Sequence, residues 1–317
     1  MTTIGVVGLG LIGGSLALAA ARAGQRVVAW DIEEPPRQQA AEAGLTVSAD
    51  LTAAELVVLA LPLPALTDDL TSTLAGVRMS ETATITDVGS VKQPVVEAIS
   101  TAGLSQHYVG GHPMAGTEQT GFPAATADLL AGARWVLCPP EQGGLDRWLQ
   151  VAAMATSVGA EVLALTASEH DAAMGLISGL PHLLALGLET AVAQGADYLP
   201  GLTAGSFADL TRVAGSTPHL LHTVTESNKD SVQVALHELL ERLDGSWEGL
   251  IDSGRRAHRA RLQRSAGAGD RSPDADKPAA VAVQGVDELL TLGRSGRYVL
   301  SVDTDRRMIT VSAAAKS

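Results

Sequence analysis

The sequence is poor in cysteine, in aromatic residues and, over most of its length, in basic residues. Among its 317 residues, one is cysteine and nine are aromatic. Residues 1–250 carry ten basic and 27 acidic side chains, and the whole chain has a formal charge of −13. Nucleic-acid binding needs a basic surface and aromatic stacking platforms, so we expect no nucleic-acid partner.

The cysteine content and the hydrophobic runs bear on the compartment. The single cysteine, Cys138, excludes an internal disulfide and favours a reducing environment, so we expect a cytoplasmic protein. A strand-like segment begins three residues after Met1, and we therefore expect no signal peptide. The stretch 172–188 has no charged residue but contains Pro181, His182 and three glycines. We interpret it as a buried helix pair and expect no membrane association.

Apolar strands alternate with helices in the first half of the chain. Residues 15–23 and 35–43 have helical patterns, and Gly44 closes the second. This alternation predicts a parallel sheet that helices cover on both faces. The expected strands are 3–7, 26–30, 56–61, 82–86, 135–137 and 161–165.

Helical patterns dominate after residue 168, and a polar segment then precedes a short tail with strand-like runs. The expected organisation has four parts: a nucleotide-binding domain (1–166), an all-helical domain (167–265), a linker (266–279) and a short β/α tail (280–317).

The segment G-L-G-L-I-G (8–13) lies between a predicted strand and a predicted helix. Its first glycine permits a tight turn, its second lets a pyrophosphate approach the backbone, and its third allows close helix packing. The start of the following helix offers N–H groups to phosphates. We expect a dinucleotide to contact Gly8, Gly10, Leu11, Ile12 and Gly13.

Asp31 ends the second predicted strand, about 20 residues after the glycine loop. A carboxylate at this position binds the ribose hydroxyls and repels a 2′-phosphate. No arginine stands among residues 32–34, and Arg37 is the nearest candidate. The sequence therefore predicts a Rossmann-type, doubly wound parallel sheet that binds NAD in preference to NADP. The alternative is a glycine turn in a domain that binds no nucleotide.

Three later segments are rich in polar groups that a plain fold would not need: D-V-G-S-V-K (87–92), G-G-H-P-M-A-G-T-E (110–118) and S-F-A-D-L-T-R (206–212). The first follows a buried strand, so we expect it at the carboxyl edge of the sheet, where ligands bind. Its one basic residue, Lys92, offers a contact for an anionic ligand.

With these motifs the chain resembles the prephenate/arogenate dehydrogenase family of tyrosine biosynthesis from about residue 4 to residue 250. The Gly-Gly-Ser ending of the glycine loop (13–15), the three polar segments and S-G-L-P-H (178–182) carry the resemblance. The resemblance implies an NAD-dependent prephenate dehydrogenase, which oxidatively decarboxylates prephenate to 4-hydroxyphenylpyruvate. It also implies that the helical domain forms a homodimer.

The resemblance further implies roles for individual residues. His112 would accept a hydrogen bond from the C4 hydroxyl of the substrate and take its proton as the hydride leaves. This role suits a histidine, because an unperturbed imidazole, with a pKa of about 6.5, is largely neutral at cytoplasmic pH. Ser90 would stand between that hydroxyl and the nicotinamide, and Arg212 would hold a substrate carboxylate. The other residues implied at the substrate are Thr117, Glu118, Ser178, His182 and Asp209.

Each of these roles has a structural alternative. His112 could be a loop histidine that the backbone satisfies, and Arg212 could pair with Asp209 three residues earlier. His182 could cap a helix. His219 and His222 have the spacing of a helical metal pair, but no third ligand converges on them, and we expect no metal.

Several readings of the whole chain stay open. Many relatives carry His where Gly179 stands, and some carry Lys where Ala208 stands. This chain lacks both of these positive contacts to the side chain of the substrate, so arogenate is an alternative substrate. A reductase of the β-hydroxyacid or imine class would place a lysine in 168–171, which has none. A non-catalytic NAD-sensing regulator would not need His112.

The C-terminal part of the chain has two features without an assigned function. The tail resembles a short, degenerate ACT-like module, with either a structural or an amino-acid-sensing role. The basic cluster Arg255–Arg264 is interpreted as a solvated helix face, with dimer contact or anion steering as alternatives.

Overall fold

A computed structural model describes residues 2–68, 70–117, 119–140, 144–267 and 278–312, with the backbone alone for 264–267. The chain divides into two compact units. Residues 1–167 and 274–317 belong to the first unit, and residues 168–273 to the second. Most of the predicted linker, 266–279, lies outside the described residues.

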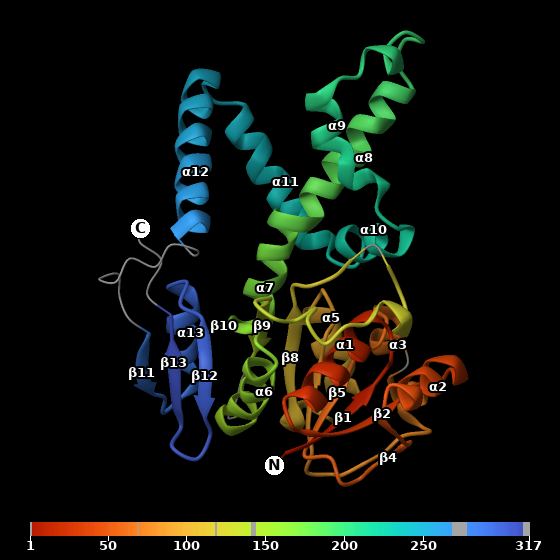
Figure 1. Cartoon of the computed structure of the whole chain (residues 1–317). Coiled ribbons are helices and arrows are strands. Elements are labelled where there is room, and N and C mark those ends of the chain that lie inside the picture. Colours follow the sequence, from red (N-terminus) through yellow and green to blue (C-terminus); the bar gives the residue numbers. More distant parts are fainter. Residues whose placement is uncertain (1, 69, 118, 141–143, 268–277, 313–317) are drawn as a thin grey trace. The chain divides into compact units, whose positions relative to one another are not determined.

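The first unit is built on one sheet (Figure 1). Within the described residues, eleven strands pair in the order β11-β13-β12-β10-β9-β8-β7-β5-β1-β2-β3. A separate parallel pair joins β4 (Asp50–Leu51) to β6 (Arg78–Met79). The bounds of the eleven strands are β1 (Thr3–Val7), β2 (Arg26–Trp30), β3 (Thr46–Val47), β5 (Leu56–Leu59), β7 (Thr84–Asp87), β8 (Tyr108–Pro113), β9 (Arg134–Cys138), β10 (Glu161–Ala164), β11 (Ala279–Ala282), β12 (Val299–Asp303) and β13 (Met308–Val311).

All six predicted strands of the first half are confirmed, within two residues at their ends. The sheet is parallel from β3 through β8, as predicted. The short strands β3, β4 and β6 were not predicted, and two further features were missed. The segment 108–113 is a strand, although Gly110, Gly111 and Pro113 are residue types that strands disfavour. In addition, β9 runs antiparallel to β8.

Each face of the sheet has its own apolar core. In β5, Leu56 and Val58 pack into the core beneath α1 and α6, whereas Val57 and Leu59 pack into the core beneath α3, α4 and α5. Full burial of each such side chain contributes roughly 1.5–3 kcal/mol. The strand is therefore a continuous apolar run because helices cover both faces. The helices of this unit are α1 (Leu11–Arg22), α2 (Glu34–Glu42), α3 (Leu63–Thr67), α4 (Leu70–Leu74), α5 (Gln93–Thr101), α6 (Leu145–Ser157) and α13 (Val286–Arg294).

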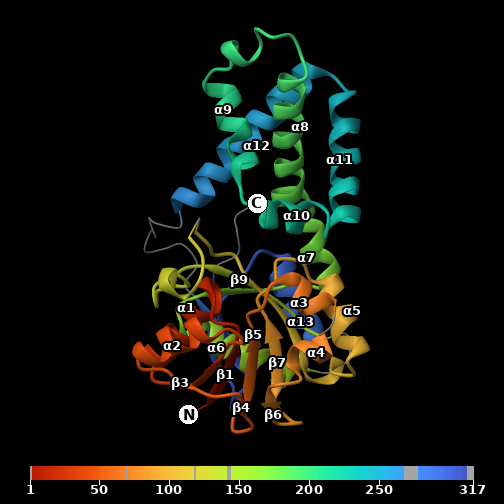
Figure 2. The same cartoon turned by 90° about the vertical axis from the view of Figure 1, so that its right-hand side faces the viewer.

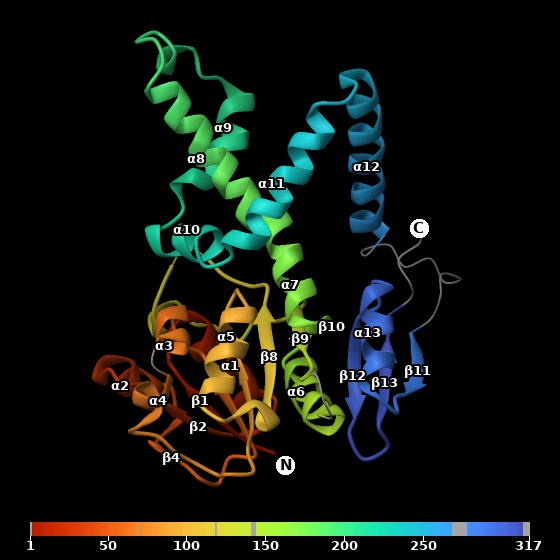
Figure 3. The ribbon, with the colours of Figure 1, turned by 180° about the vertical axis from the view of Figure 1, so that it is seen from behind.

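The described part of the tail extends the same sheet. β12 pairs antiparallel with β10 through Val299 and Val162, and β13 and β11 follow outward (Figure 3). α13 lies so close to β10 that a Cβ added at Gly293 would be 1.8 Å from the Ala164 carbonyl oxygen. The tail therefore covers the edge that β10 would otherwise expose.

The second unit is helical (Figure 2). α7 continues through one π-helical segment, Gly175–Gly179, into α8. Gly175 and Gly179 allow close packing here, since a Cβ on Gly179 would lie 2.4 Å from the Val224 carbonyl oxygen. The helices are α7 (Ala167–Met174), α8 (Leu180–Ala193), α9 (Gly205–Thr211), α10 (Pro218–Thr225), α11 (Lys229–Leu243) and α12 (Trp247–Gly267).

The helix that runs through residues 167–193 corrects the expectation of a buried helix pair. It is one continuous helix, long and apolar enough to cross a membrane by length and composition, and only 17% of its most apolar stretch is buried. Leu176 and Ile177 are 51% and 57% exposed. An apolar sequence pattern does not distinguish burial within one chain from burial against another surface.

Candidate active site

The glycine loop has the geometry that a pyrophosphate needs. Gly8 has a φ of +96°, and a Cβ there would lie 2.2 Å from the Ala60 carbonyl oxygen. A Cβ on Gly13 would lie 1.9 Å from the Gly8 carbonyl oxygen, whereas a Cβ on Gly10 would meet nothing within 4 Å. The first and third glycines are thus closed in by backbone, and the second faces open space.

The N-terminus of α1 follows directly. The N-cap residue Gly10 provides no side-chain cap, and Leu11 and Ile12 begin the helix. The first N–H groups of a helix have no partner within it and carry the positive end of its dipole. The loop and helix start therefore fit the phosphates of a dinucleotide.

Asp31 lies beside this loop at the end of β2. One of its carboxylate oxygens accepts a hydrogen bond from the Leu9 N–H at 2.6 Å, and the other accepts one from the Glu33 N–H at 2.9 Å. Arg37 donates to the carbonyl oxygens of Asp31 and Ile32, both at 2.8 Å, and its guanidinium lies 4.5 Å from the centre of the Trp30 ring. Arg37 therefore closes the turn after β2.

The second polar region lies where β7 and β8 end. β7 and β8 are parallel neighbours, so the turn after Asp87, with Ser90, reaches the same edge of the sheet as His112 and Pro113. His112 is half-buried and pairs with Val136 of β9, and Ser90 is half-buried in its turn. His112 therefore stands on a strand and not on a loop.

Lys92 does not have the role that its sequence position suggested. It is the one basic residue of the D-V-G-S-V-K turn and so offered a contact for an anionic ligand. Its side chain is 0% exposed, and its ammonium contacts the equally buried Asp87 carboxylate and donates to the Gly111 carbonyl oxygen at 2.7 Å. The basic group is thus part of the interior and unavailable to ligands.

The loop after β8 contains the next two predicted residues. Thr117 is exposed, and its hydroxyl accepts a hydrogen bond from the Gln119 N–H at 3.2 Å. Glu118 lies outside the described residues.

In the helical unit, Ser178 and His182 are linked. His182 Nδ1 donates to the Ser178 carbonyl oxygen at 2.8 Å, since a carbonyl only accepts. In a neutral ring, this bond leaves Nε2 as an acceptor. Between these two residues stands Gly179, where the close approach of Val224 and Val232 leaves no room for a side chain.

Arg212 and Asp209 are both exposed. Asp209 lies in α9, and Arg212 follows at the start of a 3-10 turn, Arg212–Gly215. Among the ion pairs of the described residues, none joins these two side chains. The ion pair with Asp209, which was the structural alternative for Arg212, is therefore not formed, and Arg212 is exposed in this unit.

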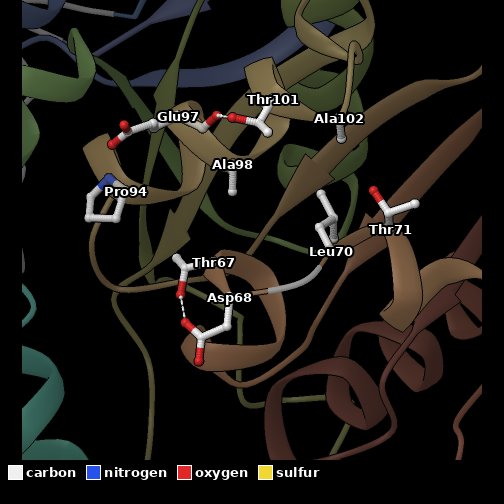
Figure 4. Close-up of a pocket in the computed structure, with 9 residues that line it drawn as sticks. All are labelled: Thr67, Asp68, Leu70, Thr71, Pro94, Glu97, Ala98, Thr101 and Ala102. Atoms are coloured by element: carbon white, nitrogen blue, oxygen red, sulfur yellow. Dashed lines mark hydrogen bonds between the residues drawn. The ribbon is translucent and has the colours of Figure 1, made fainter.

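A hollow of about 350 Å³ opens between α3, α4 and α5 (Figure 4). None of the predicted site residues lines it. Two of its polar side chains form local hydrogen bonds: Thr67 donates to Asp68 at 3.0 Å, and Thr101 donates to the Glu97 carbonyl oxygen at 2.9 Å. In the part of the chain that the structure describes, no group of three His, Cys, Asp or Glu residues could hold a metal ion.

Two family models match the chain. The model described as prephenate dehydrogenase, nucleotide-binding domain, matches residues 16–164, and the one described as prephenate dehydrogenase, dimerization domain, matches residues 166–257. Together they span most of the chain. The boundary between the two matches, at residue 165, lies close to the boundary in the sequence between the two compact units, after residue 167.

Individual relatives agree with this match. Prephenate dehydrogenase from Bacillus subtilis is 31% identical over 254 residues, which cover 76% of this chain and 68% of that protein. Prephenate dehydrogenase from A. aeolicus, solved with hydroxyphenyl propionate and NAD⁺, is 27% identical with a TM-score of 0.68, covering 84% of this chain and 96% of the other. Synechocystis arogenate dehydrogenase is 30% identical with a TM-score of 0.70, covering 85% and 99%. The chain therefore belongs to the prephenate dehydrogenase family.

Proposed function

We propose that this protein is an NAD-dependent prephenate dehydrogenase that converts prephenate to 4-hydroxyphenylpyruvate in tyrosine biosynthesis. The observation that carries the proposal is the meeting of the Ser90 turn and the His112 strand at the carboxyl edge of a sheet that also presents the glycine loop. Ligands bind at this edge of doubly wound sheets.

NAD, when bound, supplies the acceptor for the hydride that leaves C4 of the substrate. We assign to the open face at Gly10 and the start of α1 the binding of its pyrophosphate, and to Asp31 the binding of its ribose hydroxyls. Both carboxylate oxygens of Asp31 are already oriented by backbone N–H groups.

We assign the proton transfer to His112. Its imidazole accepts the proton of the C4 hydroxyl, so that a carbonyl can form there as hydride departs. Ser90 orients the same hydroxyl. Loss of carbon dioxide from C1 then makes the ring aromatic and leaves a phenolate at C4. The protonated His112 returns its proton to this oxygen, which gives the phenol of the product.

We assign a carboxylate of the substrate to Arg212, and further contacts with the substrate to Thr117, Glu118, Ser178, His182 and Asp209. An arginine holds a carboxylate in a fixed, bidentate orientation. The exposure of Arg212 in its own unit leaves its donors available.

The distinction between prephenate and arogenate is tested by steady-state kinetics with both substrates. We expect kcat/KM for prephenate to be the larger by at least tenfold. A larger value for arogenate would replace the proposed substrate with arogenate. If neither substrate gave NADH, both assignments would be contradicted.

We also propose that the helical unit forms a homodimer. The apolar face of α7 and α8 is largely exposed, and Trp247 and Ile251 on α12 are 74% and 59% exposed. The match to a dimerization domain supports a second copy as the cover. Sedimentation analysis should give twice the mass of the 317-residue chain. Single-chain mass would contradict this, and binding to lipid vesicles would favour a membrane instead.

We infer that the enzyme acts in the cytoplasm. Its one cysteine, Cys138, is buried and cannot form a disulfide within the chain, which is typical of proteins in a reducing compartment.

A further inference from the structure

A fully buried ion pair lies between the turn that carries Ser90 and the strand that carries His112. The side chains of Asp87 and Lys92 are both 0% exposed, and their charged groups are in contact. The free energy needed to remove two charges from water offsets much of the attraction between them. Apolar residues of similar volume therefore often give a protein the same stability as a buried ion pair. Stability alone does not explain this pair.

The Asp87 carboxylate is fully used. Its Oδ1 accepts from the Tyr108 hydroxyl at 2.7 Å and from the Gly111 N–H at 2.9 Å. Its Oδ2 accepts from the Gly89 N–H at 2.8 Å and from the Lys92 ammonium. Gly89 precedes Ser90 and Gly111 precedes His112, so one carboxylate holds the neighbours of both residues.

Lys92 completes the arrangement from the other side. Its ammonium also donates to the Gly111 carbonyl oxygen at 2.7 Å. Both backbone groups of Gly111 are thus bonded to the ion pair, one to each partner. Gly111, the residue before His112, is therefore fixed in position by two charge-assisted hydrogen bonds, one on each of its two peptide groups, and such bonds are stronger than neutral ones.

The glycines around the pair are required by this geometry. A Cβ on Gly111 would lie 2.4 Å from the Asp87 carbonyl oxygen, and one on Gly89 would lie 2.9 Å from Asp87 Oδ2. A Cβ on Gly110 would be 3.3 Å from Cδ of Lys92. The D-V-G-S-V-K and G-G-H segments therefore pack together around the buried ion pair, and their glycines let the backbone lie in direct contact with it.

We propose that Asp87 and Lys92 are positioning residues, which fix the separation and orientation of Ser90 and His112. The proposal rests on the roles assigned to those two residues above. Neither Asp87 nor Lys92 has exposed surface through which to contact a ligand, so any effect on turnover must act through the backbone they hold. A shift of about 1 Å in a reacting group can cost roughly a hundredfold in rate.

The test is a double-mutant cycle between Lys92→Met and His112→Asn, measured as single turnovers at saturating NAD and substrate. In the wild-type background, Lys92→Met should lower the rate roughly a hundredfold, while the Kd for NAD changes less than about twofold. In the His112→Asn background, the same change should cost less than about threefold, because the group that it positions is gone. An equal loss in both backgrounds would overturn the proposal.

Controls separate folding from positioning. Arg78→Met breaks the exposed ion pair of Arg78 with Asp50 in the same unit and should leave the rate unchanged. If Lys92→Met does not fold, the cycle is run with Asp87→Asn combined with Lys92→Met, which removes both charges. Tyr108→Phe keeps both charges and removes one bond to Oδ1, and its effect should also vanish with His112→Asn.

The same experiment distinguishes this proposal from the proposed function. A wild-type enzyme without activity on prephenate or arogenate would contradict the function itself. An active wild type with additive effects of Lys92→Met and His112→Asn would overturn the positioning role alone.

Discussion

Asp31 accepts a hydrogen bond from the Leu9 N–H at 2.6 Å, which ties the carboxylate at the end of β2 to the glycine loop after β1. The two elements of the cofactor site are therefore one connected structure. The carboxylate that we assign to the ribose also orders the backbone before Gly10.

Substitution of Asp31 should change cofactor preference. Asp31→Ser removes the charge that repels a 2′-phosphate, and the ratio of NADP to NAD affinity should rise about tenfold, equivalent to about 1.4 kcal/mol. Asp31→Asn is the matched control, because it keeps an acceptor for Leu9 and removes only the charge. Both should shift the ratio in titrations with the two cofactors. An unchanged ratio in both variants would remove the role assigned to Asp31.

The glycines of the loop should separate binding from stability. Gly13→Ala places a methyl group against backbone and should lower the free energy of unfolding by about 1–3 kcal/mol. Gly10→Ala meets no protein atom and should unfold like the wild type, but bind NAD about tenfold more weakly, or about 1.4 kcal/mol. Denaturant unfolding and NAD titration check the pair. Wild-type affinity in a folded Gly10→Ala variant would place the pyrophosphate elsewhere.

His112→Asn should lower kcat by roughly two to four orders of magnitude, as expected for the loss of a general base. The NAD affinity should be retained, because the change leaves the glycine loop intact. Steady-state turnover and cofactor titration give both quantities. A near-normal kcat would show that another group accepts the proton.

Arg212→Ala should raise the KM for substrate and leave the affinity for NAD unchanged. Arg242→Ala is the control from the same unit, since Arg242 pairs with Glu238 on the exposed face of α11. We expect the control to keep the wild-type KM. If Arg212→Ala keeps it too, a different residue holds the substrate carboxylate.

The tail should contribute to stability. Gly293→Ala inserts a methyl group between α13 and the Ala164 carbonyl oxygen, and should lower the free energy of unfolding by about 1–3 kcal/mol. Gly285→Ala, at the N-cap of α13, meets nothing within 4 Å and should have little effect. Equal stability of the two variants would favour a tail that is not packed on β10.

The sequence predicted the features that depend on local spacing. The glycine loop, Asp31 and the apolar run of β5 each follow from residues close together in the chain. Family membership confirms the predicted fold, the NAD cofactor and the dehydrogenase activity.

The missed features depend on contacts between distant residues. Gly110 and Gly111 indicated a loop, because strands disfavour glycine. In the structure, the side chain of Lys92 and the backbone of Asp87 pack against these two positions and leave little room for a Cβ. Lys92 offered a free cation by position, and its burial depends on Tyr108 and Gly111, 16 and 19 residues away in the sequence. The apolar sequence of α8 predicted burial, and it does not show that the surface covering the helix lies outside the chain's own fold.

The central claim is that this chain catalyses oxidative decarboxylation of prephenate with NAD⁺. It is tested most directly by following NADH absorbance, carbon dioxide release and 4-hydroxyphenylpyruvate in one reaction of the purified protein with prephenate and NAD⁺. We predict equal amounts of the three products, and their loss together in His112→Asn. NADH without carbon dioxide, or no NADH at all, would contradict the account.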